Sequence, residues 1–518
     1  MLSRSGGPWR IVQNTMIDLS ATSLLAKLQS GEVSSEEVTT AFLGRINAVE
    51  SRVGAFLKVN SESALQAAQA VDEKRRSGAP LGKLAGIPIA VKDILCTEGE
   101  ATTCGSRMLE NYVPPYNATV VEHLLASDAI VIGRTNMDEF AMGSSTENSA
   151  YKPTCNPWDL ERIPGGSSGG AAACLAAAMA PLSIGTDTGG SIRQPAALCG
   201  IVGLKPTYGR VSRFGLVAFA SSLDQVGPMA TTVEDTALLL ETIAGHDKRD
   251  STSAKIDVPQ YTASVNSPLE NLTIGVVPSH YQDGLNTEIE SSVKEAIRVY
   301  ESLGATIKEI EMPHAQYGIA TYYIIAPCEA SGNLARYDGA HYGYRTDRQT
   351  MLDELAEEAN QTDGAGESPL VRMYRKSRSE GFGSEVQRRV MLGTYALSEG
   401  YYDAYYLKAL KVRRLIRADY DAAFDQVDCI LGPVTASPAF RRGEKTNDPL
   451  AMYLEDLYTV NANLAGVAGI SLPCGLTSEN LPIGLHLQAA PFQEEKLLQV
   501  ANMYQSATDW HTRRPEIQ

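Results

Sequence analysis

The chain has 518 residues, of which 43% are hydrophobic and 20% are charged, and these proportions are typical of soluble globular proteins. They exclude a wholly disordered, collagenous or coiled-coil chain. The formal net charge is −16, so the chain is a poor candidate for holding a nucleic-acid backbone by itself. The sequence contains no uninterrupted apolar run of about 18 residues, and we therefore expect no membrane-spanning helix.

The first 16 residues are expected to form an N-terminal extension. They lack acidic residues up to position 15 and include Arg4 and Arg10, which leaves a short transit peptide open. Met16 directly precedes the first helical pattern, so Met1 and Met16 both remain candidate starts. The cytoplasm is the expected compartment, with a mitochondrion or plastid as the alternative. Eight scattered cysteines without a CxxC pair indicate reduced thiols in place of a disulfide framework or a zinc site.

Helical patterns dominate the first 80 residues, where Ser34 and Glu37 fit a capping box at the start of one helix. A short apolar strand follows at 87–91 and ends at Lys92. Pairs of a helix and a short strand then recur along the chain, at 171–185, 287–310 and 399–431, and two further apolar runs lie at 469–473 and 481–485. This alternation predicts one large α/β domain with a largely buried sheet covered by helices.

One segment of the chain differs in character from its surroundings. Residues 351–370 carry six acidic residues and the flexible run Gly364-Ala365-Gly366. We interpret this segment as an inserted, exposed helix and loop within the domain.

Two loops rich in glycine and serine flank a single helix–strand pair. The first loop is Pro-Gly-Gly-Ser-Ser-Gly-Gly at 164–170, and the second, at 186–195, contains Asp187, Ser191 and Arg193. Because glycine lacks a Cβ atom, backbone N–H groups in such loops can converge on a ligand. The arrangement therefore suits an anion cradle or an oxyanion hole, although a single loop of this kind is more often a tight turn with a serine cap.

Three chemistries could use these loops. A phosphate-binding loop would need a Gly-Lys-Ser/Thr triplet, which does not occur here. A nucleophile elbow matches G-x-S-x-G formally, but it needs a preceding strand and a later histidine, and His486 and His511 are poorly placed candidates. The third chemistry is a serine nucleophile whose base is a lysine, and Lys92 at the end of a strand could serve as that base.

The two loops together resemble the signature of the amidase signature family. The resemblance is carried by Gly-Gly-Ser-Ser-Gly-Gly at 165–170, by Asp-Thr-Gly-Gly-Ser-Ile-Arg-Gln-Pro at 187–195, and by the spacing of Lys92, Ser167 and Ser191. It extends over residues 17–510, which leaves 511–518 as a C-terminal tail. It implies a single α/β/α sandwich with a mixed sheet. Further motifs at 102–106, 203–213 and 400–406 are similar to the branch of the family that supplies ammonia to tRNA-dependent amidotransferases.

This resemblance implies a Ser–Ser–Lys triad. Ser191 would be the nucleophile that forms a γ-glutamyl ester, Ser167 would relay the proton, and Lys92 would be the base. A lysine can act as a base only when it is neutral, so its site must depress its pKa. The oxyanion would be held by the N–H groups of the loop of Thr188, Gly189, Gly190 and Ser191.

The resemblance also implies residues that bind glutamine, which are Tyr322, Arg389 and Asp456. An arginine can bind a carboxylate with two hydrogen bonds, and an aspartate can pair with an ammonium group. The adjacent Tyr323 and Arg388 are the alternatives to Tyr322 and Arg389.

The implied function is that of a glutaminase subunit whose ammonia converts Glu-tRNA(Gln) to Gln-tRNA(Gln). Whether Asp-tRNA(Asn) is also a substrate stays open, and a stand-alone amidase of the same family and an inactive scaffold are the alternatives. We expect no cofactor or metal in this chain. ATP and Mg²⁺ are expected on a partner B subunit, with a small C subunit completing the complex and the tRNA contacted mainly through the partner.

Overall fold

The computed structural model describes residues 16–281, 284–361 and 367–517. Eleven strands form one sheet with the order β1-β3-β2-β4-β6-β5-β10-β11-β9-β7-β8 within this described part of the chain. The strands are β1 (Phe56–Val59), β2 (Pro88–Lys92), β3 (Ile130–Thr135), β4 (Leu182–Asp187), β5 (Val202–Lys205), β6 (Gln225–Ala230), β7 (Thr273–Val276), β8 (Thr306–Glu309), β9 (Cys429–Pro433), β10 (Ala468–Leu476) and β11 (Pro482–Ala489).

The sheet is mixed. β3, β2 and β4 run parallel to one another, as do β9, β7 and β8, while every pairing from β4 through β6, β5, β10 and β11 to β9 is antiparallel. Every residue of β2, β4, β5, β6, β9 and β11 is buried, as expected for strands covered on both faces. The predicted α/β sandwich with a mixed, largely buried sheet is therefore confirmed.

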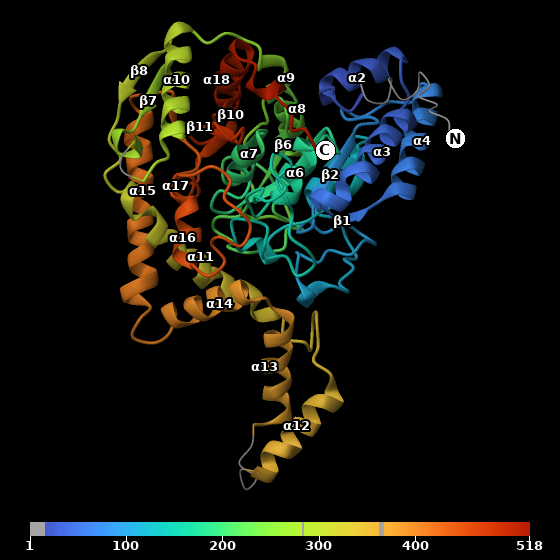
Figure 1. The fold of residues 1–518 in the computed structure, drawn as a ribbon, viewed down its shortest axis with the longest axis vertical. Coiled ribbons are helices and arrows are strands. Elements are labelled where there is room, and N and C mark those ends of the chain that lie inside the picture. Colours follow the sequence, from blue (N-terminus) through green and yellow to red (C-terminus); the bar gives the residue numbers. More distant parts are fainter. Residues whose placement is uncertain (1–15, 282–283, 362–366, 518) are drawn as a thin grey trace.

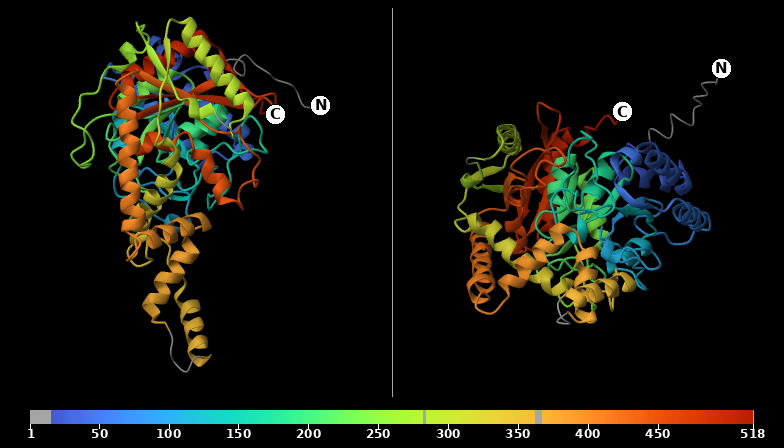
Figure 2. Two further views of the ribbon diagram at one scale, coloured as in Figure 1. Left: turned by 90° about the vertical axis from the view of Figure 1, so that its left-hand side faces the viewer. Right: turned by 60° about the horizontal axis from the view of Figure 1, so that its bottom comes forward.

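Helices lie on both sides of this sheet (Figures 1 and 2). None of the helices in the described part of the chain combines the length and the apolar character needed to cross a membrane. The longer helices are α2 (Ala21–Ser30), α3 (Ser35–Val53), α4 (Ser61–Arg76), α5 (Thr119–Ala126), α6 (Gly169–Ala176), α7 (Arg193–Cys199), α8 (Val233–Ile243), α10 (Thr287–Ser302), α11 (Gly318–Asn333), α12 (Arg348–Gln361), α13 (Pro369–Gly381), α14 (Ser384–Ala396), α15 (Lys408–Phe424), α17 (Val460–Ala465) and α18 (Glu494–Ala507), and the short ones are α9 (Tyr261–Ser264) and α16 (Pro449–Tyr453).

The start of α3 shows how local sequence sets an element boundary. The Ser34 side chain accepts a hydrogen bond from the Glu37 N–H at 3.1 Å, and the Glu37 carboxylate accepts one from the Ser34 N–H at 2.8 Å. These two bonds satisfy N–H groups that the first helical turn leaves unpaired. The capping box expected from the sequence is therefore confirmed.

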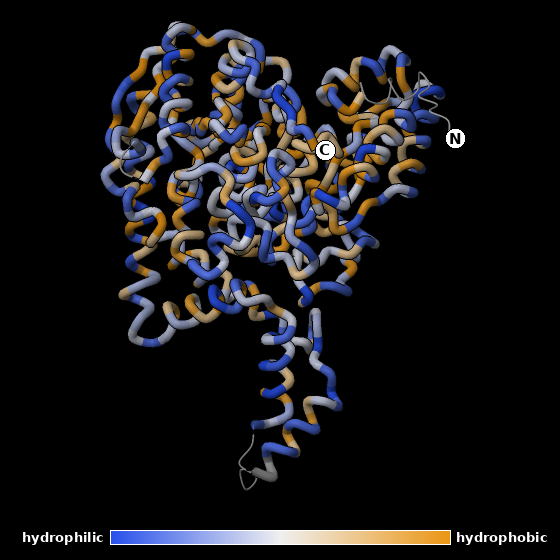
Figure 3. Tube along the Cα trace, viewed as in Figure 1, coloured by the Kyte–Doolittle hydropathy of each residue, from blue (hydrophilic) through white to orange (hydrophobic). Residues whose placement is uncertain are grey.

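α12 and α13 form an arm that projects from the body of the molecule (Figure 1). The arm is mostly hydrophilic, whereas hydrophobic residues concentrate in the body (Figure 3). Ion pairs join its two helices, since Lys376 contacts Glu354 at 2.6 Å and Arg372 contacts Glu358. The segment 351–370, which we interpreted as an exposed insertion, falls in this arm, although residues 362–366 lie outside the described residues.

The two ends of the chain bear on the remaining boundary predictions. Residues 1–15 of the expected N-terminal extension lie outside the described residues, and Met16 begins the described structure as a buried residue. Near the other end, a short 3-10 helix at Trp510–Thr512 precedes the last described residue, 517. The boundaries at 17 and 510 stay predictions.

Candidate active site

Lys92 is fully buried at the carboxyl end of β2. Its Nζ lies 2.7 Å from Ser167 Oγ, 2.9 Å from Ser168 Oγ and 2.8 Å from Thr186 Oγ1. The two serines come from the loop before α6, and Thr186 lies near the end of β4, which pairs with β2 in parallel. The parallel pairing brings the ends of both strands to one edge of the sheet, and three hydroxyl groups therefore surround one amine.

The surroundings of Lys92 change its proton affinity. Burial lowers the pKa of Lys92 to about 7, because a low-dielectric environment disfavours the ammonium form. The carboxylates of Asp138, Asp187 and Asp224 act in the opposite direction and raise it. Near neutral pH a large share of Lys92 is consequently a free amine, which can accept a proton.

Ser167 and Ser191 lie on two loops that are joined by their backbones. The Ser168 N–H donates to the Ser191 carbonyl oxygen at 3.1 Å. Ser167 is fully buried against Lys92, whereas Ser191 is 8% exposed and its hydroxyl makes no hydrogen bond to any other described residue. Ser191 is therefore the hydroxyl that a substrate could reach, and Ser167 lies on the side of the lysine.

Asp187 holds the loop that carries Ser191. Its carboxylate accepts hydrogen bonds from the N–H groups of Gly190, at 2.9 Å, and Ile192, at 3.2 Å, and it pairs with the Arg193 guanidinium at 3.0 Å. Burial raises the pKa of Asp187, but the Arg193 guanidinium lowers it and holds the pKa well below its usual range. The carboxylate is thus ionised at neutral pH and fixes the backbone on both sides of Ser191.

Some backbone N–H groups of the expected oxyanion loop are available to bind an oxyanion. The Gly190 N–H is used by Asp187, which leaves the Gly189 and Ser191 N–H groups without a hydrogen-bond partner among the described residues. A Cβ atom on Gly189 would lie 2.6 Å from Tyr322 Cζ, and Gly190 has a φ of 139°. Both positions therefore require glycine. Thr188 supports the loop through its hydroxyl, which donates to Asp224 at 2.7 Å.

Arg389 on α14 is buried, and among the described residues only its Nε makes a hydrogen bond. Its Nε donates to Glu385 at 2.7 Å, while one terminal nitrogen is buried and has no hydrogen-bond partner in the described part of the chain. The guanidinium lies 5.2 Å from the ring centres of both Tyr323 and Tyr453. An unpaired buried donor is costly, so this guanidinium is well suited to a carboxylate ligand. The neighbouring Arg388 is 38% exposed and pairs with Glu385 at the surface.

Tyr323 contacts both Asp456 and Arg389, so that these two residues lie near each other. The Tyr323 hydroxyl donates to Asp456 at 2.8 Å, and the Ser144 hydroxyl donates to it at 3.0 Å. Burial raises the pKa of Asp456 to about 7, because a low-dielectric environment disfavours the ionised carboxylate. Tyr322 packs instead against Gly189 in the oxyanion loop. The structure thus brings all the residues named from the sequence to one place.

Sequence reasoning missed several residues of this site. Ser168 and Thr186 bond Lys92 directly, and Ser144 and Tyr323 hold Asp456. Ser168 and Thr186 could have been suspected, because both lie within the two loops that the sequence singled out. Ser144 carried no such signal, since its loop is far from Asp456 in sequence.

The alternative nucleophile elbow finds no support in the geometry. His486 lies in β11 and is fully buried, with its Nε2 3.1 Å from the Arg193 guanidinium. Burial lowers its pKa well below the usual range. It is hydrogen-bonded to neither Ser167 nor Ser191, both of which the structure describes. Lys92 is therefore the residue that can serve as the base.

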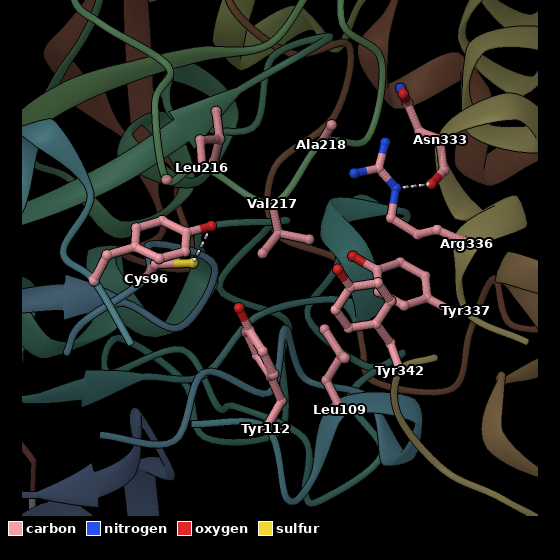
Figure 4. A pocket seen from close by; sticks show the side chains of 12 residues that line it. Cys96, Leu109, Tyr112, Leu216, Val217, Ala218, Asn333, Arg336, Tyr337 and Tyr342 are labelled. Atoms are coloured by element: carbon pink, nitrogen blue, oxygen red, sulfur yellow. Dashed lines mark hydrogen bonds between the residues drawn. The ribbon is translucent and has the colours of Figure 1, made fainter. Parts of the chain in front are cut away.

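A separate cavity of ≈ 170 Å³ lies among residues that include Cys96, Tyr112, Val217 and Tyr337 (Figure 4). None of Lys92, Ser167 and Ser191 lines it. Burial raises the pKa of Cys96, so its thiol stays protonated and is a poor nucleophile. This cavity therefore lacks the chemistry that the lysine–serine cluster offers.

The chain is similar to proteins of known families. The family model described as Amidase matches residues 37–498. A protein of Rhodopirellula baltica, named as the A subunit of glutamyl-tRNA(Gln) amidotransferase, is 58% identical over 96% of this chain and 98% of its own length.

Solved structures with the same fold include the A subunit of glutamyl-tRNA(Gln) amidotransferase from Thermotoga maritima, with a TM-score of 0.78, 39% identity, and coverage of 96% of this chain and 97% of that chain. A peptide amidase in complex with chymostatin has a TM-score of 0.77 and 29% identity, with coverage of 96% and 99% of the two chains. The matched family model spans both glycine- and serine-rich loops, and the chain therefore belongs to the amidase family.

Proposed function

We propose that the chain is the glutaminase subunit of a tRNA-dependent amidotransferase. The observation that carries this proposal is the buried amine of Lys92 bonded to Ser167 in the same site as Arg389 and Asp456. The first pair suits amide cleavage, and the second pair matches the carboxylate and ammonium groups of a free amino acid. The similarity to proteins named as the A subunit of an amidotransferase supports this choice over a stand-alone amidase.

In the proposed mechanism, Ser191 attacks the side-chain amide carbon of glutamine. The Ser191 proton passes to the Ser167 oxygen as the Ser167 proton passes to neutral Lys92. The proton then returns by the same route to the leaving nitrogen, so that ammonia departs and a γ-glutamyl ester remains on Ser191. Water, activated by the same base, hydrolyses the ester to glutamate and regenerates the hydroxyl.

The loop that contains Ser191 would stabilise the charged intermediate. The N–H groups of Gly189 and Ser191 have no partner among the described residues and could donate to the oxyanion, and Asp187 holds the loop in place before substrate arrives. Donors that are fixed in advance need no reorganisation during the reaction, and removal of one typically costs about 2.7–4 kcal/mol.

The ammonia would be used by a partner. Amidation of a tRNA-bound carboxylate requires activation, and we propose that a B subunit supplies the ATP and Mg²⁺ site, with a small C subunit in the complex. Glu-tRNA(Gln) is the proposed acceptor, and Asp-tRNA(Asn) is a second candidate acceptor for the same complex. The net charge of −16 supports placing the tRNA contact mainly on the partner.

Replacement of Lys92 tests the base. Lys92→Arg and Lys92→Ala should each lose at least about 100-fold in kcat, because a guanidinium stays protonated and a methyl group cannot accept a proton. In the wild type, kcat at saturating glutamine should rise with pH through about 7 as Lys92 loses its proton. Saturation matters because Asp456, with a pKa near 7, also affects glutamine binding.

Lys205 provides a matched control for this prediction. Burial lowers its pKa to about 7 as well, but its Nζ donates to the Pro206 carbonyl oxygen and, within the described residues, to no serine. In Lys205→Met, the pH at which kcat reaches half of its maximum should be the same as in the wild type. Substantial turnover by Lys92→Arg would contradict a neutral-lysine mechanism.

The glutamine-binding residues should separate binding from chemistry. Arg389→Ala and Asp456→Asn should raise the KM for glutamine by at least about tenfold and change kcat less, because each removes one charge that grips the amino-acid end. Propionamide lacks both charged groups, and the two variants should hydrolyse it as fast as the wild type does. Arg388→Ala on the same helix serves as the control and should leave both substrates unaffected. Equal losses on glutamine and propionamide would make Arg389 and Asp456 structural.

Dependence on the partner tests the function as a whole. The isolated chain should hydrolyse glutamine weakly and show no ATP-dependent transamidation, and its co-purified partners should restore both activities with mischarged Glu-tRNA(Gln). Partner binding would act by populating a competent arrangement of the catalytic loops. The measurement is steady-state kinetics of the chain with and without its partners. High glutamine turnover that partner, tRNA and ATP leave unchanged would favour the stand-alone amidase.

A further inference from the structure

Glu139 is a buried carboxylate that the proposed chemistry does not use. Its side chain is almost fully buried, and it begins a short 3-10 helix at Glu139–Ala141. The Ser106 hydroxyl donates to one carboxylate oxygen, and the Gly383 N–H donates to the other at 2.8 Å. Glu139 therefore connects two segments, one of which lies 244 residues away from it in the chain.

One side of this connection leads to the catalytic loop. The preceding residue, Asp138, donates its N–H to the Ser167 carbonyl oxygen at 3.4 Å. Its carboxylate accepts hydrogen bonds from the N–H groups of Thr146, at 2.9 Å, and Asn148, at 3.1 Å. The residue directly before Glu139 is thus hydrogen-bonded to the loop that carries Ser167.

The other side leads to the helix of the glutamine-binding arginine. Phe382 and Gly383 form the corner between α13 of the arm and α14, which carries Arg389. Gly383 is the N-cap of α14 and has no side chain to cap the helix, and its own N–H is held by Glu139. Phe140 packs against Phe382 with ring centres 5.7 Å apart. The corner at 382–383 therefore packs against the segment 139–141 through one hydrogen bond and one aromatic contact.

We propose that Glu139 is a positioning residue that fixes the corner at Gly383, and with it Arg389, relative to the loop that carries Ser167. This inference rests on the proposed function, because it assigns Arg389 to the glutamine carboxylate. A clamp that shifts by a fraction of an ångström weakens substrate binding even when the nucleophile itself is intact. The arm meets the body at the same corner, because α13 ends there.

The bond to Gly383 does not require a charged acceptor. Burial raises the pKa of Glu139 to about 7, and both the ionised and the protonated carboxyl group can accept an N–H. A glutamine side chain retains one carbonyl oxygen for the same purpose. The Ser106 hydroxyl can then turn to the Gly381 carbonyl oxygen, which lies 3.4 Å away. Glu139→Gln is therefore the conservative variant, whereas Glu139→Ala removes both bonds.

The test compares glutamine with propionamide in the full chain co-purified with its partners. Glu139→Ala should raise the KM for glutamine by about tenfold, with a smaller change in kcat and little change on propionamide. Gly383→Ala should show the same pattern, because a Cβ atom there would lie 2.6 Å from the Glu139 carboxylate. Glu139→Gln should restore the KM to within about threefold of the wild-type value.

Asp235 supplies a matched structural control. It is also a buried carboxylate, and it accepts hydrogen bonds from the N–H groups of Ala21 at 2.8 Å and Thr22 at 2.9 Å, away from the proposed site. Asp235→Ala should lower the melting temperature and leave the ratio of the two KM values unchanged.

Two outcomes would overturn the inference alone. In the first, Glu139→Ala behaves like Asp235→Ala, with lower stability and an unchanged KM ratio. In the second, Glu139→Gln is as defective as Glu139→Ala. A wild-type complex without glutaminase activity, or one whose activity survives Ser191→Ala, would overturn the proposed function and this inference with it.

Discussion

The burial of one amine at the end of a strand is the constraint on which the site depends. Lys92 is surrounded by hydroxyl groups and enclosed by the sheet, so that desolvation brings its pKa down to about 7. Three buried carboxylates oppose this effect, and without them the ammonium form would be still less stable. The balance leaves a base that is poised near neutral pH, whereas an exposed lysine has a pKa of about 10.4.

The fold assembles the site from parts that are distant in sequence. β2 and β4 carry the lysine and the loop of Ser191, while α14 and a short 3-10 helix at Leu454–Asp456 carry the two side chains proposed to bind the amino-acid end of glutamine. Contacts such as Thr459 Oγ1 to the Gly189 carbonyl oxygen, at 2.6 Å, hold these halves together. The two parts of the proposed site thus keep their spacing because hydrogen bonds join the segments that carry them.

Much of the fold and of the lysine–serine cluster could be predicted from the sequence. The capping box of Ser34 and Glu37 is a local signal, and Lys92 follows a short apolar strand whose end is readable from the chain. The order of strands could not be predicted, because β5 pairs with β10 through contacts between segments more than 260 residues apart. Ser144 was missed for the same reason, since its partner Asp456 is 312 residues away. Local patterns reveal elements and loops, whereas long-range pairing decides which side chains meet.

The central claim is that Ser191 becomes acylated by glutamine with Lys92 as the base. It is tested most directly by rapid quenching of the complex during turnover, followed by peptide mass spectrometry. The account predicts a γ-glutamyl adduct on Ser191 in the wild type, and no adduct in Ser191→Ala. A glutamyl adduct on Ser167, on Ser168 or on a cysteine, formed at the rate of turnover, would contradict it.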